Sequence, residues 1–197
     1  MKKLFIFRHG ETDWNAAGRF QGHLDIPLND CGRDQAKSLV KTLNEQKIEA
    51  VLSSDLKRAL ETAQIVAEHF QIPVFTDAGL REAHLGEAQG LTYSEIETKF
   101  GETATRWKSR HLTDADISYP GGESGTQVFQ RTMAAIEKFF KDQDFSRIGL
   151  SCHGGVIRRI MQNILPPGSD PVPIPNAVLY ILEYNSKNKS LGMYKKN

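Results

Sequence analysis

Two histidines in this chain follow short apolar segments that could place them at a phosphate site. His9 comes directly after LFIF at residues 4–7 and Arg8, and His153 follows IGLSC at residues 148–152. Short apolar segments that break at glycine are typical of buried strands in a parallel sheet. Because ligands bind beyond the carboxyl ends of such strands, we expect both imidazoles at one ligand site.

The arginines near these histidines favour an anion over a metal ion as the ligand. Arg8 precedes His9, and Arg58 falls in the first turn of a predicted helix after the second strand. Guanidinium groups bind a phosphate dianion through charge-assisted hydrogen bonds. The same charges lower the pKa of a neighbouring imidazole, and a neutral imidazole nitrogen is a competent nucleophile toward phosphorus.

A phosphate ester also needs a proton on its leaving oxygen, and Glu82 is the candidate general acid. It lies in an irregular segment, residues 77–93, that follows a predicted strand. General acid catalysis contributes on the order of 10² to 10⁴ in rate. Glu87 is a second carboxylate in this segment, and we rank it below Glu82.

The order of the predicted elements indicates an α/β fold. Strands are predicted near residues 3–8, 50–53, 72–76, 148–152, 177–184 and 190–195, the last two antiparallel. Helices are predicted near residues 30–43, 56–70, 94–100, 125–140 and 155–165. This alternation predicts a three-layer α/β/α sandwich, with a mostly parallel central sheet and an antiparallel edge strand.

The segments between these helices and strands are expected to form loops and a small cap. Residues 11–29 read as a long loop with little regular structure, and such loops are usually functional. Ser54 or Asp55 can cap the helix that follows. We expect one domain over residues 1–197, with a small cap around residues 86–120 whose part from 106 to 119 is mobile. A proline-rich stretch, residues 166–175, is expected to be a rigid loop.

The composition narrows the classes of partner and the compartment. The chain has 25 Lys and Arg against 24 Asp and Glu, so neither nucleic acid nor an anionic membrane is expected as a partner. Cys31 and Cys152 form no C-x-x-C motif, which favours a reducing, cytoplasmic compartment. No apolar window approaches the length of a membrane span. The oligomeric state stays open, with a homo-oligomer among the choices.

These residues resemble the motifs of the histidine phosphatase superfamily, which includes cofactor-dependent phosphoglycerate mutases and small phosphatases. The matching strings in chain order are RHGET at residues 8–12, GRFQG at 18–22, SSDLKRA at 53–59, Glu82 with Gly86 and Gly90, GGES at 121–124, and SCHGG at 151–155. Each string alone is a weak signal. Together, in this order over residues 3 to about 160, they are highly specific.

The resemblance implies a role for each matching residue. His9 would be phosphorylated, and Glu82 would protonate the leaving group and then activate water. The side chains that would contact the phosphoryl group are Arg8, Arg58, His153 and Asn15. The residues that would complete the binding site around it are Gln21, Gly22 and Gly154. The family uses no metal, so we expect neither a metal nor another cofactor.

Departures from the mutase pattern favour a phosphatase. The mutases carry Glu-Arg-His-Tyr-Gly where this chain has EAHLG at residues 82–86. Their cap also has an Arg-Arg pair for the substrate carboxylate, whereas Arg106 and Arg110 are separated here. We therefore predict a metal-independent phosphomonoesterase that acts on a small phosphorylated metabolite through phosphohistidine. The alternatives are a phosphoglycerate mutase and a catalytically weak module that binds phosphorylated ligands or proteins.

Two other chemistries fit part of the sequence. The string CHGGVIR at residues 152–158 matches the Cys-x-x-Gly-x-x-Arg loop of cysteine-based phosphatases, but that interpretation leaves Arg8 and Arg58 unexplained. A metal site of His9, His153 and Glu82 would face repulsion from the same arginines. Trp14 and Phe20 are expected to pack within their loop.

Overall fold

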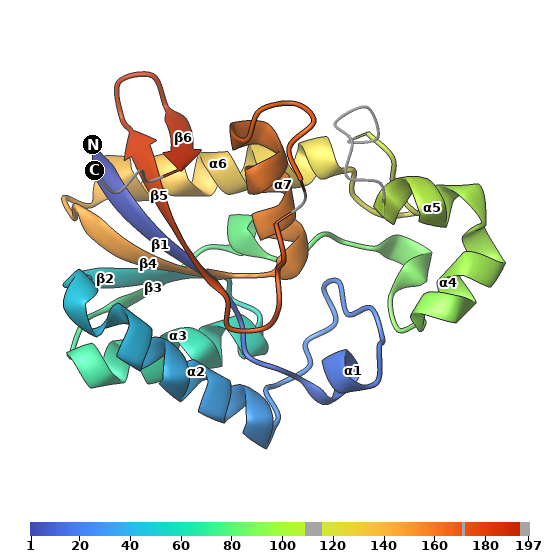
Figure 1. Ribbon diagram of the computed structural model, residues 1–197, viewed down its shortest axis with the longest axis horizontal. Helices are drawn as coiled ribbons and strands as arrows, with labels where there is room; N and C mark the ends of the chain where they lie inside the picture. Colours follow the sequence, from blue (N-terminus) through green and yellow to red (C-terminus); the bar gives the residue numbers. More distant parts are fainter. Residues whose placement is uncertain (109–115, 171, 194–197) are drawn as a thin grey trace.

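A six-stranded sheet with helices on both faces organises the computed structural model, which describes residues 1–108, 116–170 and 172–193 (Figure 1). The strand order is β3-β2-β4-β1-β5-β6. The mutually parallel strands are β1 (Lys2–Arg8), β2 (Ala50–Ser53), β3 (Val74–Thr76) and β4 (Arg147–Cys152). The antiparallel strands are β5 (Leu179–Asn185) and β6 (Ser190–Met193). This arrangement confirms the predicted fold class.

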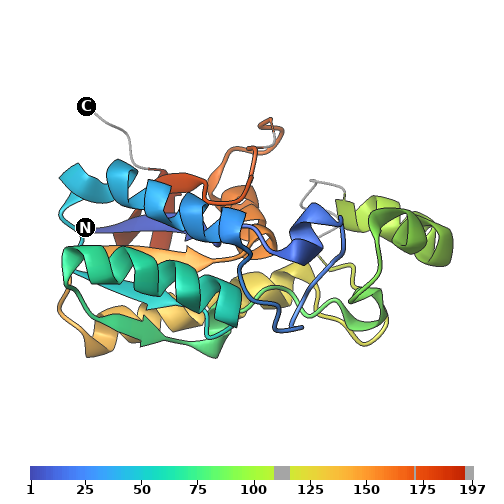
Figure 2. The same cartoon turned by 90° about the horizontal axis from the view of Figure 1, so that it is seen from below.

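Two helix pairs cover opposite faces of the sheet (Figures 1 and 2). The pairs are α2 (Asp30–Leu43) with α3 (Lys57–Phe70), and α6 (Gly125–Asp142) with α7 (Gly154–Ile164). Phe5 and Phe7 pack into the cluster that includes the first pair, while Leu4 and Ile6 pack into the cluster on the other face. Burial on both faces explains why β1 is apolar without alternation.

N-capping side chains account for the starts of α2 and α6 but not for the start of α3. Asn29 caps α2 by accepting from the Gly32 amide, and Ser124 forms a capping box at the start of α6. The predicted cap of α3 by Ser54 or Asp55 is wrong, because α3 has Leu56 at its N-cap position with no side-chain cap bond. Both polar side chains are instead held by tertiary partners, described below.

Most of the remaining helical segments lie around the carboxyl end of the parallel strands, whereas the turn at residues 44–46 lies at the opposite end, beside Arg147. They are α1 (Asp13–Ala16), α4 (Tyr93–Phe100) and α5 (Glu102–Lys108), with 3₁₀ turns η1 (Asn44–Gln46), η2 (Ala78–Leu80) and η3 (Gly86–Ala88). The loop predicted over residues 11–29 therefore contains a short helix, capped through Thr12 and Asn15. Of the stretch predicted as a mobile cap, residues 109–115 lie outside the described residues. Figure 1 shows α4 and α5 beyond the end of the sheet.

Within the part of the chain that the structure describes, no helix combines the length and the apolarity that crossing a membrane requires.

Candidate active site

His9 and His153 lie next to each other at the carboxyl edge of the sheet. Arg8 is paired with Cys152 across the adjacent parallel strands β1 and β4, so the next residue of each strand emerges at the same edge. The His9 amide donates to the Cys152 carbonyl at 3.0 Å, and the two imidazole centroids are 5.1 Å apart. The structure thus brings together the two imidazoles, as the strand pattern predicts.

The hydrogen bond of His9 fixes its tautomer. Nδ1 lies 2.6 Å from the Gly10 carbonyl oxygen, which can only accept, so Nδ1 carries the proton. Nε2 then keeps its lone pair. Burial lowers the pKa of His9 well below its ordinary value, and the charges of Arg8 and Arg58 lower it further. This imidazole is therefore neutral at physiological pH and has one nitrogen able to attack.

Close packing holds the carbonyl that orients His9. The Gly10 amide donates to Thr62 Oγ1 at 3.1 Å, and the Thr62 hydroxyl donates to the Arg58 carbonyl at 2.8 Å. A Cβ atom on Gly10 would lie 2.2 Å from the Gly32 carbonyl oxygen. Only glycine allows the loop after β1 to approach the first turn of α2 so closely.

His153 is oriented through the nitrogen that faces Ser54. The distance between His153 Nε2 and Ser54 Oγ is 2.9 Å, and Ser54 Oγ accepts from the Leu56 amide. The Ser54 hydroxyl can therefore donate to Nε2, which leaves Nδ1 as the protonated nitrogen. Nδ1 is buried and has no hydrogen-bond partner among the described residues. Burial lowers the pKa of His153 well below its ordinary value, with a smaller effect from Arg58.

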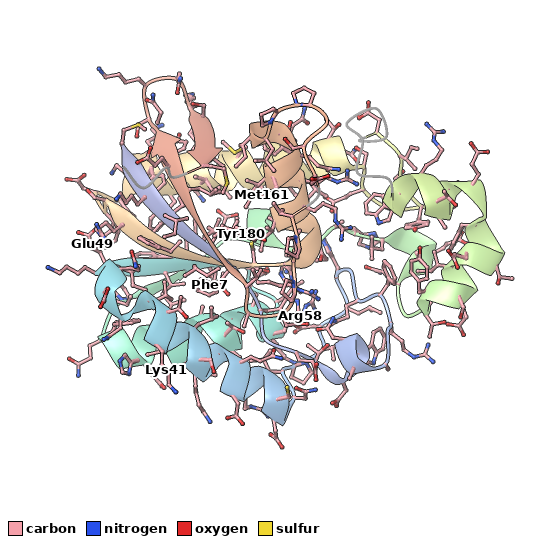
Figure 3. All side chains as sticks on the ribbon, viewed as in Figure 1. Phe7, Lys41, Glu49, Arg58, Met161 and Tyr180 are labelled. Atoms are coloured by element: carbon pink, nitrogen blue, oxygen red, sulfur yellow. The ribbon has the colours of Figure 1, made fainter. Side chains whose placement is uncertain are left out.

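Arg58 is buried and Arg8 is partly buried, and both have donors to spare. Arg58 donates to the carbonyls of Leu24 and Gly22, both at 2.8 Å, and Arg8 donates to the Ile174 carbonyl at 2.8 Å. Burial lowers the pKa of Arg58 to about 10, so the group stays charged at neutral pH. In both side chains Nε is buried without a partner in the described parts of the chain. Figure 3 shows Arg58 where the central strands end. Such unpaired donors suit an anion.

Glu82 lies at the first turn of α7. Its carboxylate accepts from the Ala83 amide at 2.9 Å and from the Gly155 amide at 3.0 Å. A Cβ atom on Gly155 would lie 2.2 Å from Glu82 Oε1, so a side chain at this position would displace the carboxylate. The negative charge of Glu82 raises the pKa values of Arg8 and Arg58, opposing the effect of burial.

These groups line one end of a cavity of about 360 Å³. We call Arg8, His9, Arg58 and Glu82 the inner wall. His153 is fully buried, and its ring centroid lies 5.1 Å from that of His9. The four residues predicted to bind around the phosphoryl group also line the cavity: Asn15, Gln21, Gly22 and Gly154.

Two of these four residues present a defined polar atom. Asn15 Oδ1 accepts from Thr12 and Asn176, which leaves its amide NH₂ as the part that can donate to a ligand. Gln21 is 7% exposed, and its Oε1 has no hydrogen-bond partner in the described structure.

The far end of the cavity is aromatic. We call Phe20, Tyr93 and Trp107 the outer wall. Phe20 stacks on Tyr93 with ring centroids 6.1 Å apart, and the guanidinium of Arg159 lies 5.0 Å from the Trp107 ring centroid. Phe20 thus packs against a ring outside its own loop, and it also lines the cavity.

The family model of the histidine phosphatase superfamily (branch 1) matches residues 4–197, which is nearly the whole chain. The chain belongs to the histidine phosphatase superfamily. The predicted resemblance is confirmed. In this histidine phosphatase, each residue of the inner wall belongs to one of the sequence strings that carry the resemblance.

Similar proteins include phosphatases and a mutase-like protein. The chain is 45% identical over 166 residues to phosphoglycerate mutase-like protein 4 of Arabidopsis thaliana, covering 83% of this chain and 71% of the relative. It is 39% identical to the metal-independent phosphoserine phosphatase of the same plant, covering 85% and 70%. Mycobacterial glucosyl-3-phosphoglycerate phosphatase has a solved structure with a TM-score of 0.82, 32% identity, and coverage of 93% of each chain. These names support the predicted phosphatase class and are compatible with the mutase alternative.

Cys152 does not have the surroundings of a nucleophile. The side chain is fully buried on β4, and burial raises the pKa of its thiol, so the thiolate required for attack is disfavoured. Val156 and Ile157, which occupy the two free positions before Arg158 in the cysteine-phosphatase loop pattern, pack into the core as expected. The geometry favours His9 over Cys152.

The metal alternative meets two obstacles. Both carboxylate oxygens of Glu82 already accept from amides, and the cations Arg8 and Arg58 border the same space. Across residues 1–108, 116–170 and 172–193, no three His, Cys, Asp or Glu side chains are grouped as a metal site.

Several supporting residues carry no local signal that the sequence analysis used. Asn176 donates to the His9 carbonyl at 3.1 Å from the segment that follows the proline-rich loop. Asp55 accepts from Arg81 Nε at 2.7 Å, which ties the Glu82 segment to the start of α3. Ser54 was expected as a helix cap, and its contact with His153 required knowing that β2 and β4 are adjacent.

Proposed function

We propose that this protein hydrolyses a small phosphate ester without a metal ion, through a phosphorylated His9. The observation that carries the proposal is a buried, neutral imidazole between two arginines that have unpaired Nε donors. A dianionic phosphoryl group would satisfy these donors and would meet the lone pair of His9 Nε2.

The first step transfers the phosphoryl group to His9. Arg8, Arg58 and His153 hold the phosphoryl oxygens, and His9 Nε2 attacks phosphorus. The bond between phosphorus and the ester oxygen breaks, and Glu82 gives its proton to that oxygen, so an alcohol leaves. Positive charge around the transferring group stabilises the transition state.

The second step returns the enzyme to its starting state. The Glu82 carboxylate takes a proton from a water molecule, whose oxygen attacks phosphorus. The bond between phosphorus and His9 Nε2 breaks, and inorganic phosphate leaves. Asn15, Gln21 and Gly22 line the path by which the leaving group and water would exchange.

The outer wall gives the expected character of the substrate. Its aromatic rings suit a leaving group with an apolar face, and Arg158 and Arg159 add positive charge to the same cavity. The substrates named for the relatives, glucosyl-3-phosphoglycerate and phosphoserine, are small phosphorylated acids. A substrate of this size and charge is consistent with the cavity, and the reduced cysteines favour action in the cytoplasm.

Mutase activity is the second candidate, supported by the name of one relative. The mutase must hold the carboxylate of phosphoglycerate while the phosphoryl group returns to the same skeleton. Arg106 lies on the exposed side of α5 and is not part of the cavity lining, and Arg110 lies outside the described residues. The preference for water as the acceptor rests on the sequence EAHLG at residues 82–86, which departs from the mutase string. A module that only binds phosphorylated ligands would have no need for the Glu82 carboxyl in the same cavity as His9.

A panel of phosphate esters tests the choice between these functions. Each ester is incubated with the protein in the presence of a chelator, and free phosphate and transfer products are measured together. The proposal predicts release of phosphate that is unaffected by the chelator. Faster isomerisation of phosphoglycerate than phosphate release would favour the mutase, and binding without turnover of any ester would favour the binding module.

A further inference from the structure

The backbone of Glu82 is held by two side chains from distant parts of the chain. The Glu82 carbonyl accepts from His23 Nε2 at 2.7 Å and from Arg131 Nη2 at 2.8 Å. His23 belongs to the loop after α1, and Arg131 belongs to α6. Residues 81–85 themselves belong to no helix or strand. The position of the Glu82 carboxylate therefore depends on contacts from outside its own segment.

Arg131 contacts the start of this segment and the 3₁₀ turn before it. Its Nη1 atom donates to the carbonyls of Gly79 at 2.8 Å and Arg81 at 2.7 Å. Together with the bond to Glu82, one guanidinium satisfies three carbonyls between η2 and the active site. Loss of these donors would leave the Arg81 carbonyl unpaired, whereas the Glu82 carbonyl would keep its bond from His23 and the Gly79 carbonyl its bond from the Thr132 hydroxyl at 3.4 Å. The segment would then have to shift or recruit water at Arg81.

Glu123 fixes the guanidinium in turn. Its carboxylate accepts from Arg131 Nε at 2.8 Å and Nη2 at 3.0 Å, and also from the His84 amide at 2.7 Å. Burial opposes the ionisation of Glu123, but the bonds from Arg131 and His84 lower the pKa of its carboxyl overall. Arg131 therefore binds the carbonyls of residues 79, 81 and 82, and Glu123 binds the amide of residue 84. We call this set of contacts the grip. The side chains of Arg131 and Glu123 are only 21% and 24% exposed.

We propose that Glu123 and Arg131 are positioning residues, which set the distance between the Glu82 carboxyl and the leaving oxygen. This inference rests on the proposed function, in which Glu82 is the general acid. The grip acts on the backbone of Glu82, while its carboxylate stays in contact with the first turn of α7. A displacement of about 1 Å in such a group can reduce the rate about 10²-fold.

The test compares two esters that differ in their need for an acid. The leaving oxygen of p-nitrophenyl phosphate departs as a stable phenolate, whereas that of a simple alkyl phosphate must be protonated. The ratio kcat/KM reports the phosphorylation step, so it isolates the role of Glu82 as an acid. The variants are Arg131→Met, Arg131→Lys and Glu123→Gln, with Glu82→Gln as the reference for complete loss of the acid.

We expect Arg131→Met to lower kcat/KM for the alkyl ester about 10²-fold and for p-nitrophenyl phosphate less than about fivefold. Arg131→Lys should recover part of the loss. Glu123→Gln should show the same pattern as Arg131→Met, with a larger loss of kcat/KM for the alkyl ester than for p-nitrophenyl phosphate, but both losses should be smaller. Competitive inhibition by inorganic phosphate should change less than about twofold, because Arg8 and Arg58 are not part of the grip.

Arg147 supplies a matched control. This arginine also donates to a backbone carbonyl, that of Gln46, but it lies at the start of β4, at the opposite end of the sheet. Arg147→Met should leave the ratio between the two esters unchanged. Thermal unfolding of every variant is measured, and the nearly isosteric Glu123→Gln keeps the test available if Arg131→Met does not fold.

Two results would overturn the inference while the proposed function stands. Equal losses for both esters would mean a structural role, and unchanged kinetics in every variant would mean that the grip is dispensable. If Glu82→Gln itself affected both esters equally, the general acid of the proposed function would be wrong, and the positioning role would be wrong with it.

Discussion

The inner and outer walls of the cavity are built from different kinds of structure. His9 follows β1 directly, Arg58 lies in the first turn of α3, and both are almost fully buried. Phe20 and Tyr93 come from the loop after α1 and from α4, beyond the end of the sheet (Figure 1). Strand ends place the reactive groups, and peripheral segments form the surface around the leaving group. We therefore expect changes in the inner wall to affect every ester and changes in the outer wall to separate one ester from another.

The largest effect should follow from removing the nucleophile. His9→Ala is expected to reduce kcat/KM by about 10³-fold or more for every ester, because no other group in the proposed mechanism forms the covalent intermediate. Steady-state kinetics on the ester panel measures the loss, and thermal unfolding checks that the variant is folded. Near-normal turnover would show that the inner wall does not work through His9.

The pH dependence of stability should come from two buried histidines, His9 and His153. Folding keeps the pKa values of His9 and His153 depressed, so both are neutral when folded but gain protons on unfolding below about pH 6.5. Their contribution to stability is fully present above that pH and is lost as the pH falls toward the depressed values. The slope can reach about 3 kcal/mol per pH unit when both take part.

Chemical denaturation at several pH values measures this slope. His153→Gln removes one of the two groups, so its free energy of unfolding should depend less steeply on pH below 6.5 than that of the natural chain. An unchanged slope would mean that His153 is already protonated in the folded protein.

The sequence placed His9 and His153 at one edge of the sheet because both follow predicted strands. The segment LFIF at residues 4–7 is apolar throughout because alternate side chains enter the two cores, and that pattern placed His9 at a strand end. His153 followed from the same reasoning. The family motifs then identified Arg58 and Glu82, which periodicity alone would leave among many surface residues.

The predictions that failed concern residues whose tertiary contacts outweigh the local conformational preference of their side chains. Ser54 and Asp55 have good N-cap side chains, yet one contacts His153 and the other Arg81, and α3 begins after them. The short helix α1 was missed because it spans only residues 13–16. Arg131 reads as an ordinary residue on α6, because the carbonyls that it contacts lie about fifty residues earlier in the chain.

A change in the outer wall should have a smaller and more selective effect. Phe20→Ala is expected to raise KM about threefold to tenfold for esters with a large leaving group, because apolar contact area is lost. The effect on a minimal alkyl ester and on kcat should stay within about twofold. Phe20→Leu, which keeps most of the apolar surface, serves as the control. A large fall in kcat for every ester would remove the distinction between the walls.

The smallest effect is expected just behind the inner wall. Cys152 is adjacent to His153 in sequence but is held on β4 as a neutral thiol, so Cys152→Ser should change kcat/KM by less than about twofold. The same assay with an alkylating reagent should show no protection by inorganic phosphate. A loss comparable with that of His9→Ala would make the thiol the nucleophile.

The central claim is tested most directly by trapping the intermediate. The protein is mixed with a radiolabelled phosphate ester, quenched with base within the first turnover, and digested for mass spectrometry. The account predicts label on His9 that is stable in base, is lost in acid, and is absent from His9→Ala. Acid-stable label, or label that persists in His9→Ala, would contradict it.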